Sequence, residues 1–400
     1  MVINMCEYNN VPKIRFKGFT GVWEQRKLEE ISNRFDNLRV PVSANDREKG
    51  TTPYYGANGI QDYVKGFTHN GEFVLIAEDG ANDLKNYPVK YVNGLFWANN
   101  HVHVVQGKEG ICDNKYLKYY FTKTNIESLL VGGGRAKLNA NIMMGIDLEI
   151  PSLNEQIKLG RMFSEIDNLI TLHQRKCDTL VNAKKSLLEK MFPKNSSNIP
   201  EIRFKEFTDV WEQRKLGEIG NTFTGLSGKT KEDFGHGEAK FVTYMNVFSN
   251  PIAQLNKTEP IEIDNKQNQV EYGDVFFTTS SETPDEVGMS SVWLENKGNI
   301  YLNSFCFGFR PFVKNDPYYM AYMLRANRFR KSMTLLAQGI SRYNISKIGV
   351  MNIDIQLPNN QEQERIGKLF SEIDNLITLH QRKLEKLKNI KKSMLDKMFV

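Results

Sequence analysis

The chain has 400 residues, a length that suggests two or three domains. It is 40% hydrophobic and 25% charged, as is typical of a globular protein, and its formal net charge of +6 permits an anionic partner without proving one. The chain contains no apolar run of about 18 residues and no apolar N-terminal signal core, so we expect a cytoplasmic protein without a membrane partner. The four cysteines lie far apart, which favours reduced thiols over zinc ligands or disulfides.

Two pairs of stretches repeat along the chain. PKIRFKGFTGVWEQRKLEEI begins at Pro12, and PEIRFKEFTDVWEQRKLGEI begins at Pro200. FSEIDNLITLHQRK occurs unchanged at 163–176 and at 370–383. The middle segments scarcely match, and the chain is therefore a tandem duplication. Its shared flanks predict docking to one kind of partner, and its divergent middles predict two different targets.

Both middle segments show short strand-like runs, glycine-rich turns and a late helix. The strand-like runs are GEFVLIAEDGAN (71–82), FWANNHVHVVQG (96–107), GDVFFTTSSE (273–282) and NIYLNSFCFGFRP (299–311). The predicted helices are DNKYLKYYFTKTN (113–125) and DPYYMAYMLRANRFRK (316–331). Mixed α/β middle domains follow from this order.

A glycine-led turn with an arginine follows the late helix in each copy. VGGGRAKLN (131–139) aligns with QGISRYNIS (338–346), which matches Gly132 with Gly339 and Arg135 with Arg342. Such a turn suits contact with phosphate or guanine. A surface turn with an ordinary salt bridge is an equally good explanation. The predicted DNA-binding residues are Arg135, Lys137, Asn139, Arg342, Tyr343, Asn344, Lys229 and Ser281.

Three short motifs imitate catalytic sites. TGLSGKT (224–230) has Phe223 where a phosphate-binding loop requires its first glycine. DPYY at Asp316 lacks an accompanying glycine-rich cofactor motif, so a helix start explains it better. PD at Pro284 with ENK at Glu295 imitates a metal nuclease and could hold Mg²⁺, but it is short and occurs in one copy. We therefore predict no catalytic residues and no metal site.

The repeated tails predict long helices with a coiled-coil seam. Apolar residues recur there at alternating spacings of four and three, the 3.5-residue period of a coiled coil. The predicted seam includes Phe163, Ile166, Ile170, Leu180, Phe370, Ile373, Ile377 and Leu387. It is interrupted at matching places by His173, Lys184, His380 and Lys391, which we expect to fix the register. The second middle domain lies between the helices in the chain, which predicts an antiparallel pair and a dumbbell of two domains on a rod.

Taken together, these residues resemble the specificity subunit of type I restriction–modification systems over essentially the full chain. The resemblance rests on the two WEQRKL heads, YYGANGIQDYV, LIAEDGA, TYMNVFSN, FFTTSSETPDEVG and the IDNLI…RK helices. It implies a DNA-binding subunit without catalytic residues. Two target-recognition domains would each read half of a bipartite double-stranded DNA site, and the helices would set the gap.

The resemblance also implies partners and cofactors outside this chain. The partners are two methyltransferase subunits and the restriction/translocase subunits, on which S-adenosylmethionine, ATP and Mg²⁺ are expected. A stand-alone nuclease and a coiled-coil scaffold are the alternatives. We predict an α+β fold with recognition domains at 1–152 and 194–358 and antiparallel spacer helices at 153–193 and 359–400.

Overall fold

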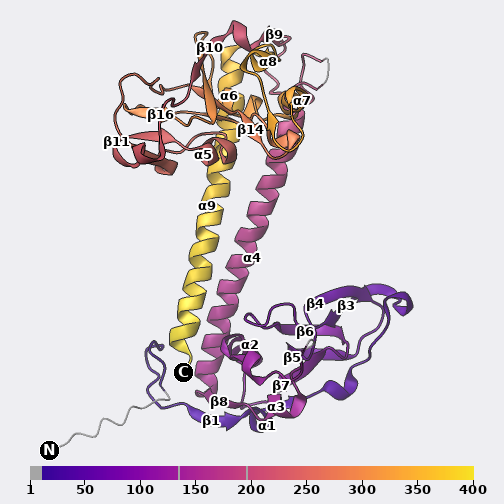
Figure 1. The fold of residues 1–400 in the computed structure, drawn as a ribbon. Helices are drawn as coiled ribbons and strands as arrows, with labels where there is room; N and C mark the ends of the chain where they lie inside the picture. The colour runs from indigo at the N-terminus through magenta and orange to yellow at the C-terminus, as the bar shows by residue number, and fades with distance from the viewer. Residues whose placement is uncertain (1–10, 134–135, 195–196) are drawn as a thin grey trace, which may run out of the picture. The chain divides into compact units, whose positions relative to one another are not determined.

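The computed structural model describes residues 11–133, 136–194 and 197–400. The chain forms two compact units, one of residues 1–174 and 382–400 (unit 1) and one of residues 175–381 (unit 2). The helices α4 (Leu153–Lys190) and α9 (Asn360–Met398) each contribute one part to each unit (Figure 1). The boundary falls after Gln174 in one helix and after Gln381 in the other, which are the same place in the repeated stretch.

Unit 1 is built around one mixed sheet. Its elements before α4 are β1 (Glu24–Lys27), α1 (Leu28–Ile31), β2 (Ser32–Arg34), β3 (Lys49–Gly56), β4 (Gly59–Val64), β5 (His69–Ala77), β6 (Val89–Ala98), β7 (Val102–Gly107), α2 (Asn114–Lys123), α3 (Ala140–Met144) and β8 (Asp147–Ile150). The six-stranded sheet has the order β2-β7-β5-β6-β3-β4, and β3 pairs with β6 in parallel. β1 and β8 form a separate antiparallel pair that joins the repeated head to the strand before α4.

Unit 2 repeats this plan with a different middle. Its elements before α9 are β9 (Glu212–Lys215), β10 (Gly220–Thr224), β11 (Phe234–Val242), α5 (Tyr244–Ser249), β12 (Thr258–Ile261), β13 (Val275–Thr278), β14 (Ser280–Ser281), β15 (Ser290–Val292), β16 (Ile300–Leu302), β17 (Cys306–Pro311), α6 (Pro317–Met323), α7 (Asn327–Leu336), β18 (Tyr343–Asn344), α8 (Lys347–Met351) and β19 (Asp354–Leu357). The sheets are β10-β17-β13-β15, β12-β11-β16, β14-β18 and β19-β9. The predicted mixed helix and sheet content is confirmed in both units.

Three predicted elements of unit 2 are each divided in the structure. The run 273–282 contains β13 and β14, the run 299–311 contains β16 and β17, and the predicted helix 316–331 contains α6 and α7. Ala326, at the break between these helices, has an extended backbone with ψ 154°. The half-buried Arg325 beside it donates hydrogen bonds to four backbone carbonyls of neighbouring segments, which ties the break into the unit.

The repeated head is tied to the start of the long helix in the same way in each unit. Arg15 lies 2.7 Å from Glu155 in unit 1, and Arg203 lies 2.7 Å from Glu362 in unit 2. Both glutamates are almost fully buried. A buried carboxylate without its partner is costly, so these ion pairs explain why the flanks of the two copies resemble each other.

The predicted seam positions lie on the buried side of both long helices. Every seam position of α4 and α9 is buried or half-buried, and most other helix positions are exposed. The four apolar residues with the lowest exposure among the predicted set are Phe163, Phe370, Ile373 and Ile377. The period of 3.5 residues therefore describes the buried face of both helices.

The helix segments within each unit run antiparallel. In unit 1, Phe163 packs on Phe399 and Asp167 binds Lys391, so rising numbers on α4 meet falling numbers on α9. In unit 2 the corresponding contacts are Lys184 with Asp374 and Phe192 with Phe370. The predicted orientation is confirmed in both units.

The two long helices begin at matching places. The Asn359 side chain caps α9 by accepting a hydrogen bond of 2.9 Å from the Glu362 amide. α4 begins at Leu153, and the Gln156 amide donates to the Ser152 carbonyl. Within the three described ranges, no helix is both long and apolar enough to cross a membrane.

Candidate nucleic-acid interface

The two glycine-led turns are closed by the same backbone pairing. Hairpin 1 is the name used for the turn closed by Val131 and Lys137, of which residues 131–133 and 136–137 are described, and hairpin 2 spans residues 338–344. In each, the first and last residues form a bridge through two N–H···O bonds of 2.9 Å. The two hairpins occupy corresponding positions in the duplication, so the alignment made from sequence holds in the backbone.

Glycine is required at the second position of each hairpin. Gly132 has φ +98° and Gly339 has φ +145°, values that residues with a Cβ rarely adopt. A Cβ on Gly339 would also lie 2.0 Å from the backbone oxygen of Arg342. The next residue, Ile340, is 95% exposed, so hairpin 2 presents an apolar side chain beside its arginine.

Both hairpins dock at the end of a central strand. Hairpin 1 forms a bridge with Asp79, just after β5, and hairpin 2 contributes β18, which pairs with β14 just after β13. These backbone pairings give each hairpin a fixed base at the end of a central strand.

The predicted DNA-binding residues of the two hairpin regions lie in different environments. Arg135 falls outside the described residues. Arg342 and Asn344 are exposed on hairpin 2, and Tyr343 is half-buried. Asn139 is half-buried and stands at the N-cap position of α3. Arg342 is thus a cationic side chain that an approaching phosphate or base could reach.

Other predicted DNA-binding side chains already have partners in the chain. The Lys137 ammonium lies 2.7 Å from Glu78, and the Lys229 ammonium lies 2.8 Å from Asp264. Ser281 is buried and donates to a neighbouring backbone carbonyl. Contact with DNA at these lysines would therefore require an ion pair to be exchanged.

A cluster of charged side chains lies beneath hairpin 1. Asp36, Glu78 and His103 place ligand-type atoms within 4.8 Å of one another. Arg39 lies 2.5 Å from Glu78, and Lys137 completes the cluster. Because these cations already neutralise the carboxylates, the cluster is better explained as an ion network than as a metal centre.

The electrostatics of the cluster favour the ionised acids. Burial raises the pKa of Asp36, but the hydrogen bond and charge of His103 outweigh burial and lower the pKa below its ordinary value. Burial also raises the pKa of Glu78, and its bonds to Lys137 and Arg39 lower it overall. Sequence reasoning missed this cluster, because its members come from distant segments and no local spacing links them.

The seam lysines of the long helices meet aspartates of the repeated stretch. In unit 1, Asp167 accepts from Lys391 at 2.6 Å, from Lys118 at 2.7 Å and from the Tyr119 hydroxyl at 2.7 Å. Burial lowers the pKa of Lys118 to about 8 despite this ion pair. One carboxylate therefore joins both long helices to α2.

The corresponding junction exists in unit 2. Asp374 lies 2.6 Å from Lys184 and accepts from the Tyr322 hydroxyl at 2.9 Å. The expected register role of the seam lysines is thereby given a structural basis, since a slip of either helix would separate a half-buried ammonium from its carboxylate.

The repeated helical stretch also exposes matching leucines. Leu169 and Leu172 in unit 1 are 44% and 46% exposed, and Leu376 and Leu379 in unit 2 are each 45% exposed. Single exposed leucines are ordinary on protein surfaces. The same pair is exposed in both copies, within the fourteen identical residues of the repeated stretch.

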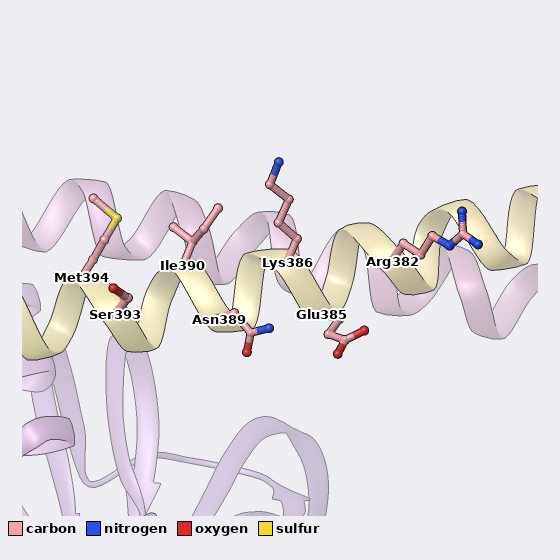
Figure 2. Close-up of a pocket in the computed structure, with 7 residues that line it drawn as sticks. All are labelled: Arg382, Glu385, Lys386, Asn389, Ile390, Ser393 and Met394. Atoms are coloured by element: carbon pink, nitrogen blue, oxygen red, sulfur yellow. The ribbon is translucent and has the colours of Figure 1, made fainter. Parts of the chain in front are cut away.

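A surface groove runs along the part of α9 that belongs to unit 1. In Figure 2, Lys386, Ile390 and Met394 lie on one side of the helix and Glu385 and Asn389 on the other; Arg382 and Ser393 complete the lining. Every lining residue comes from one helix. The groove therefore has no second wall of polar groups that could surround a small substrate.

Comparison with known proteins gives a family match in both copies. The model of the type I restriction modification DNA specificity domain matches residues 21–182 and again residues 208–389. The two matches contain both hairpins and most of both long helices. They cover more than half of the chain.

Similar proteins cover nearly the whole chain. A putative type I restriction enzyme specificity subunit of Haemophilus influenzae is 29% identical over 88% of each chain. The MjaVIII specificity subunit of Methanocaldococcus jannaschii is 24% identical over 94% of this chain and 91% of the relative. A crystal structure of the S subunit from M. genitalium is 14% identical, with a TM-score of 0.63, and covers 98% of this chain and 99% of the other. The chain belongs to the family of the type I restriction modification DNA specificity domain, of which it carries two copies.

Proposed function

We propose that this chain is the sequence-specific DNA-binding subunit of a type I restriction–modification complex and that each unit reads one half of a bipartite site. The family match in both copies supports this function over a stand-alone nuclease or a coiled-coil scaffold. The chain selects the DNA sequence, and the chemical steps belong to partner subunits.

The observation that carries the proposal is the repeated hairpin on two different middles. Residues 131–137 and 338–344 have the same backbone pairing and the same position after a central strand. The surrounding strands differ in number and order between the units. The same hairpin on two different surfaces suits two domains that contact DNA in a similar way but recognise different sequences.

The partner subunits dock on the repeated helical stretch. Leu169 and Leu172 would receive one methyltransferase subunit, and Leu376 and Leu379 would receive a second. Two identical surfaces favour two copies of the same partner. Restriction/translocase subunits would join this assembly, and the S-adenosylmethionine, ATP and Mg²⁺ would be bound by these partners rather than by this chain.

The long helices act as the spacer between the two readers. The ion pairs of Lys391 with Asp167 and of Lys184 with Asp374 fix the helix register within each unit. A fixed register gives the complex a fixed number of base pairs between the two half-sites.

The test is methylation-site sequencing in a host that carries the whole system. With the chain present, methylated adenines should fall within one bipartite sequence with an unspecified gap of constant length. Deletion of the chain should abolish that methylation, and return of the chain should restore it. Methylation of the same sites in the deletion strain would contradict the proposal.

A further inference from the structure

The registers of the two central sheets identify which residues of the units correspond. Ile76 on β5 faces His103 on β7 in unit 1, and Phe277 on β13 faces Phe307 on β17 in unit 2. Two residues after Ile76 comes Glu78. By the same count from Phe277, Glu78 corresponds to Thr279, and His103 corresponds to Phe307.

The base of each hairpin is fastened at these corresponding positions. The Leu138 amide donates to the Glu78 backbone carbonyl at 2.7 Å, and the Ile345 amide donates to the Thr279 carbonyl at 3.1 Å. Leu138 is fully buried. The backbone contact is thus the same in both units, and only the side chains around it differ.

In unit 1 the surrounding side chains are ionic. The Glu78 carboxylate lies 2.7 Å from Lys137 on the hairpin and 2.5 Å from Arg39. The His103 ring reaches the Leu138 backbone oxygen with its Nε2 at 2.8 Å. Two side chains of the sheet therefore hold the base of hairpin 1, Glu78 through the Lys137 side chain and His103 through the backbone of Leu138.

The other nitrogen of His103 is also engaged. Its Nδ1 lies 2.7 Å from the Asp36 carboxylate, and the ring is 1% exposed. Both ring nitrogens lie within hydrogen-bond distance of an oxygen atom, which fixes the orientation of the ring. Arg34 and Arg39 lie 3.7 Å from the same Asp36 carboxylate, which completes the charged surroundings of the ring.

In unit 2 the corresponding side chains are uncharged. Phe307 is fully buried and stacks on Phe277 with 5.2 Å between the ring centroids. The Thr279 hydroxyl donates to the Phe305 carbonyl at 2.9 Å. The base of hairpin 2 therefore lies over packed aromatic rings, whereas the base of hairpin 1 is held by ion pairs between side chains.

We propose that Glu78 and His103 are positioning residues that hold hairpin 1 for recognition of the first half-site, and that recognition of the second half-site does not depend on such an ion network. This inference rests on the proposed function. It identifies a difference between two readers that share a backbone device. Neutralising Glu78 would remove the carboxylate that joins Lys137 to Arg39 and would loosen the base of hairpin 1.

The first experiment measures binding of the full chain with its partner subunits to DNA duplexes. The duplexes carry the methylation-defined site, or that site with base changes in one half only. Glu78→Gln should reduce discrimination at the first half-site about tenfold or more. Discrimination at the second half-site and binding to unrelated DNA should stay unchanged. Glu72→Gln is the matched control, because it removes the same charge from an exposed position of β5.

The second experiment measures hydrogen exchange at the hairpin bases and does not depend on DNA. Lys137→Met removes the hairpin side of the ion pair at a largely exposed position, so it should fold even where Glu78→Gln does not. The Leu138 amide should exchange faster in either variant. The Ile345 amide of unit 2, observed in the same sample, should not change.

The outcomes separate this inference from the function on which it rests. A wild-type complex that fails to discriminate at either half-site would overturn the proposed function and this inference with it. Wild-type discrimination that Glu78→Gln leaves intact, or reduces equally at both half-sites, would overturn the positioning role alone. Unchanged exchange of Leu138 in Lys137→Met would also overturn it.

Discussion

The side chain of Arg342 is exposed on hairpin 2 beside the almost fully exposed Ile340. Lys137 and Lys229, which carry the same charge, are bound to carboxylates of the chain. When an ammonium leaves a carboxylate to bind a phosphate, the loss of the first ion pair offsets part of the free energy gained from the second. Arg342 is therefore the side chain through which unit 2 is expected to gain most affinity for DNA.

Replacing Arg342 with alanine should weaken DNA binding by about 1–3 kcal/mol, because a guanidinium contact to base or phosphate is lost. The measurement is a titration of the complex with a duplex that carries the full site. Arg365→Ala is the control, since Arg365 is an exposed arginine of unit 2 that lies on α9 and pairs with Glu206. If wild type and Arg342→Ala bound the duplex with equal affinity, Arg342 would be an ordinary surface residue that does not contact DNA.

The acids beneath hairpin 1 predict a pH dependence of stability. The pKa values of Asp36 and Glu78 are lower in the folded chain than their ordinary values. The unfolded chain then binds more protons as the pH falls, so the stabilisation is complete above the ordinary pKa of about 4 and is lost below it.

Urea unfolding at a series of pH values checks this dependence. Glu78→Gln should unfold at lower urea than wild type at pH 7, and the difference should shrink as the pH falls through the lowered pKa of Glu78. A difference that stayed constant down to pH 3 would show that the carboxylate charge is not what stabilises unit 1.

Residue-level chemistry was only partly predictable from the sequence. The hairpin alignment followed from duplication alone, since Gly132 and Gly339 occupy matching positions with positive φ. The contact of His103 with Asp36 did not, because these residues are 67 positions apart and only the sheet brings them together. Local patterns record periodicity and turns, whereas side-chain partners across a sheet depend on its strand order.

The long helices are the elements that the sequence predicted best. Their 3.5-residue period is maintained over many turns, so a few polar residues in the seam do not hide it. The break between α6 and α7 was missed, since Ala326 is itself a good helix former and tertiary contacts outweigh its propensity.

The seam can be tested at Ile373, which is 9% exposed on α9. Ile373→Asp would place a carboxylate without a partner between the helices and should cost several kcal/mol of unfolding free energy. Circular dichroism during urea unfolding gives the size of the loss. Ser371→Asp, at a half-buried position outside the seam, is the control and should cost much less. Equal stability of the two variants would argue against the seam.

The exposed leucines predict the stoichiometry of the complex. Changing Leu169 and Leu172 to glutamate should remove one methyltransferase subunit of two, because only one of the two equivalent surfaces is altered. Native mass spectrometry counts the bound subunits directly. Val181→Glu changes an exposed apolar residue of α4 outside the identical stretch and should leave two subunits bound. Loss of both subunits, or of neither, from the double leucine variant would contradict separate docking surfaces.

At the level of the whole chain, the duplication is the feature that sequence reasoning used most effectively. Letter-for-letter repeats predicted two units, and each unit has its own head, sheet, hairpin and helix junction. The middles could be predicted only as mixed α/β, because their strand orders differ and short strands carry weak signals. The two middle segments thus fold differently between the same flanking elements. This is what we expect of two domains that recognise different DNA sequences.

Exchange of one middle tests the proposal of two independent readers most directly. Residues 217–357 are replaced by the corresponding middle of a relative with a different target, and both long helices and the first middle are retained. Methylation-site sequencing of a host with the hybrid system should show one half of the recognised sequence changed, with the other half and the gap length unchanged. If both halves changed together, the two middles would form one composite DNA-binding surface, and the proposal of independent readers would be wrong.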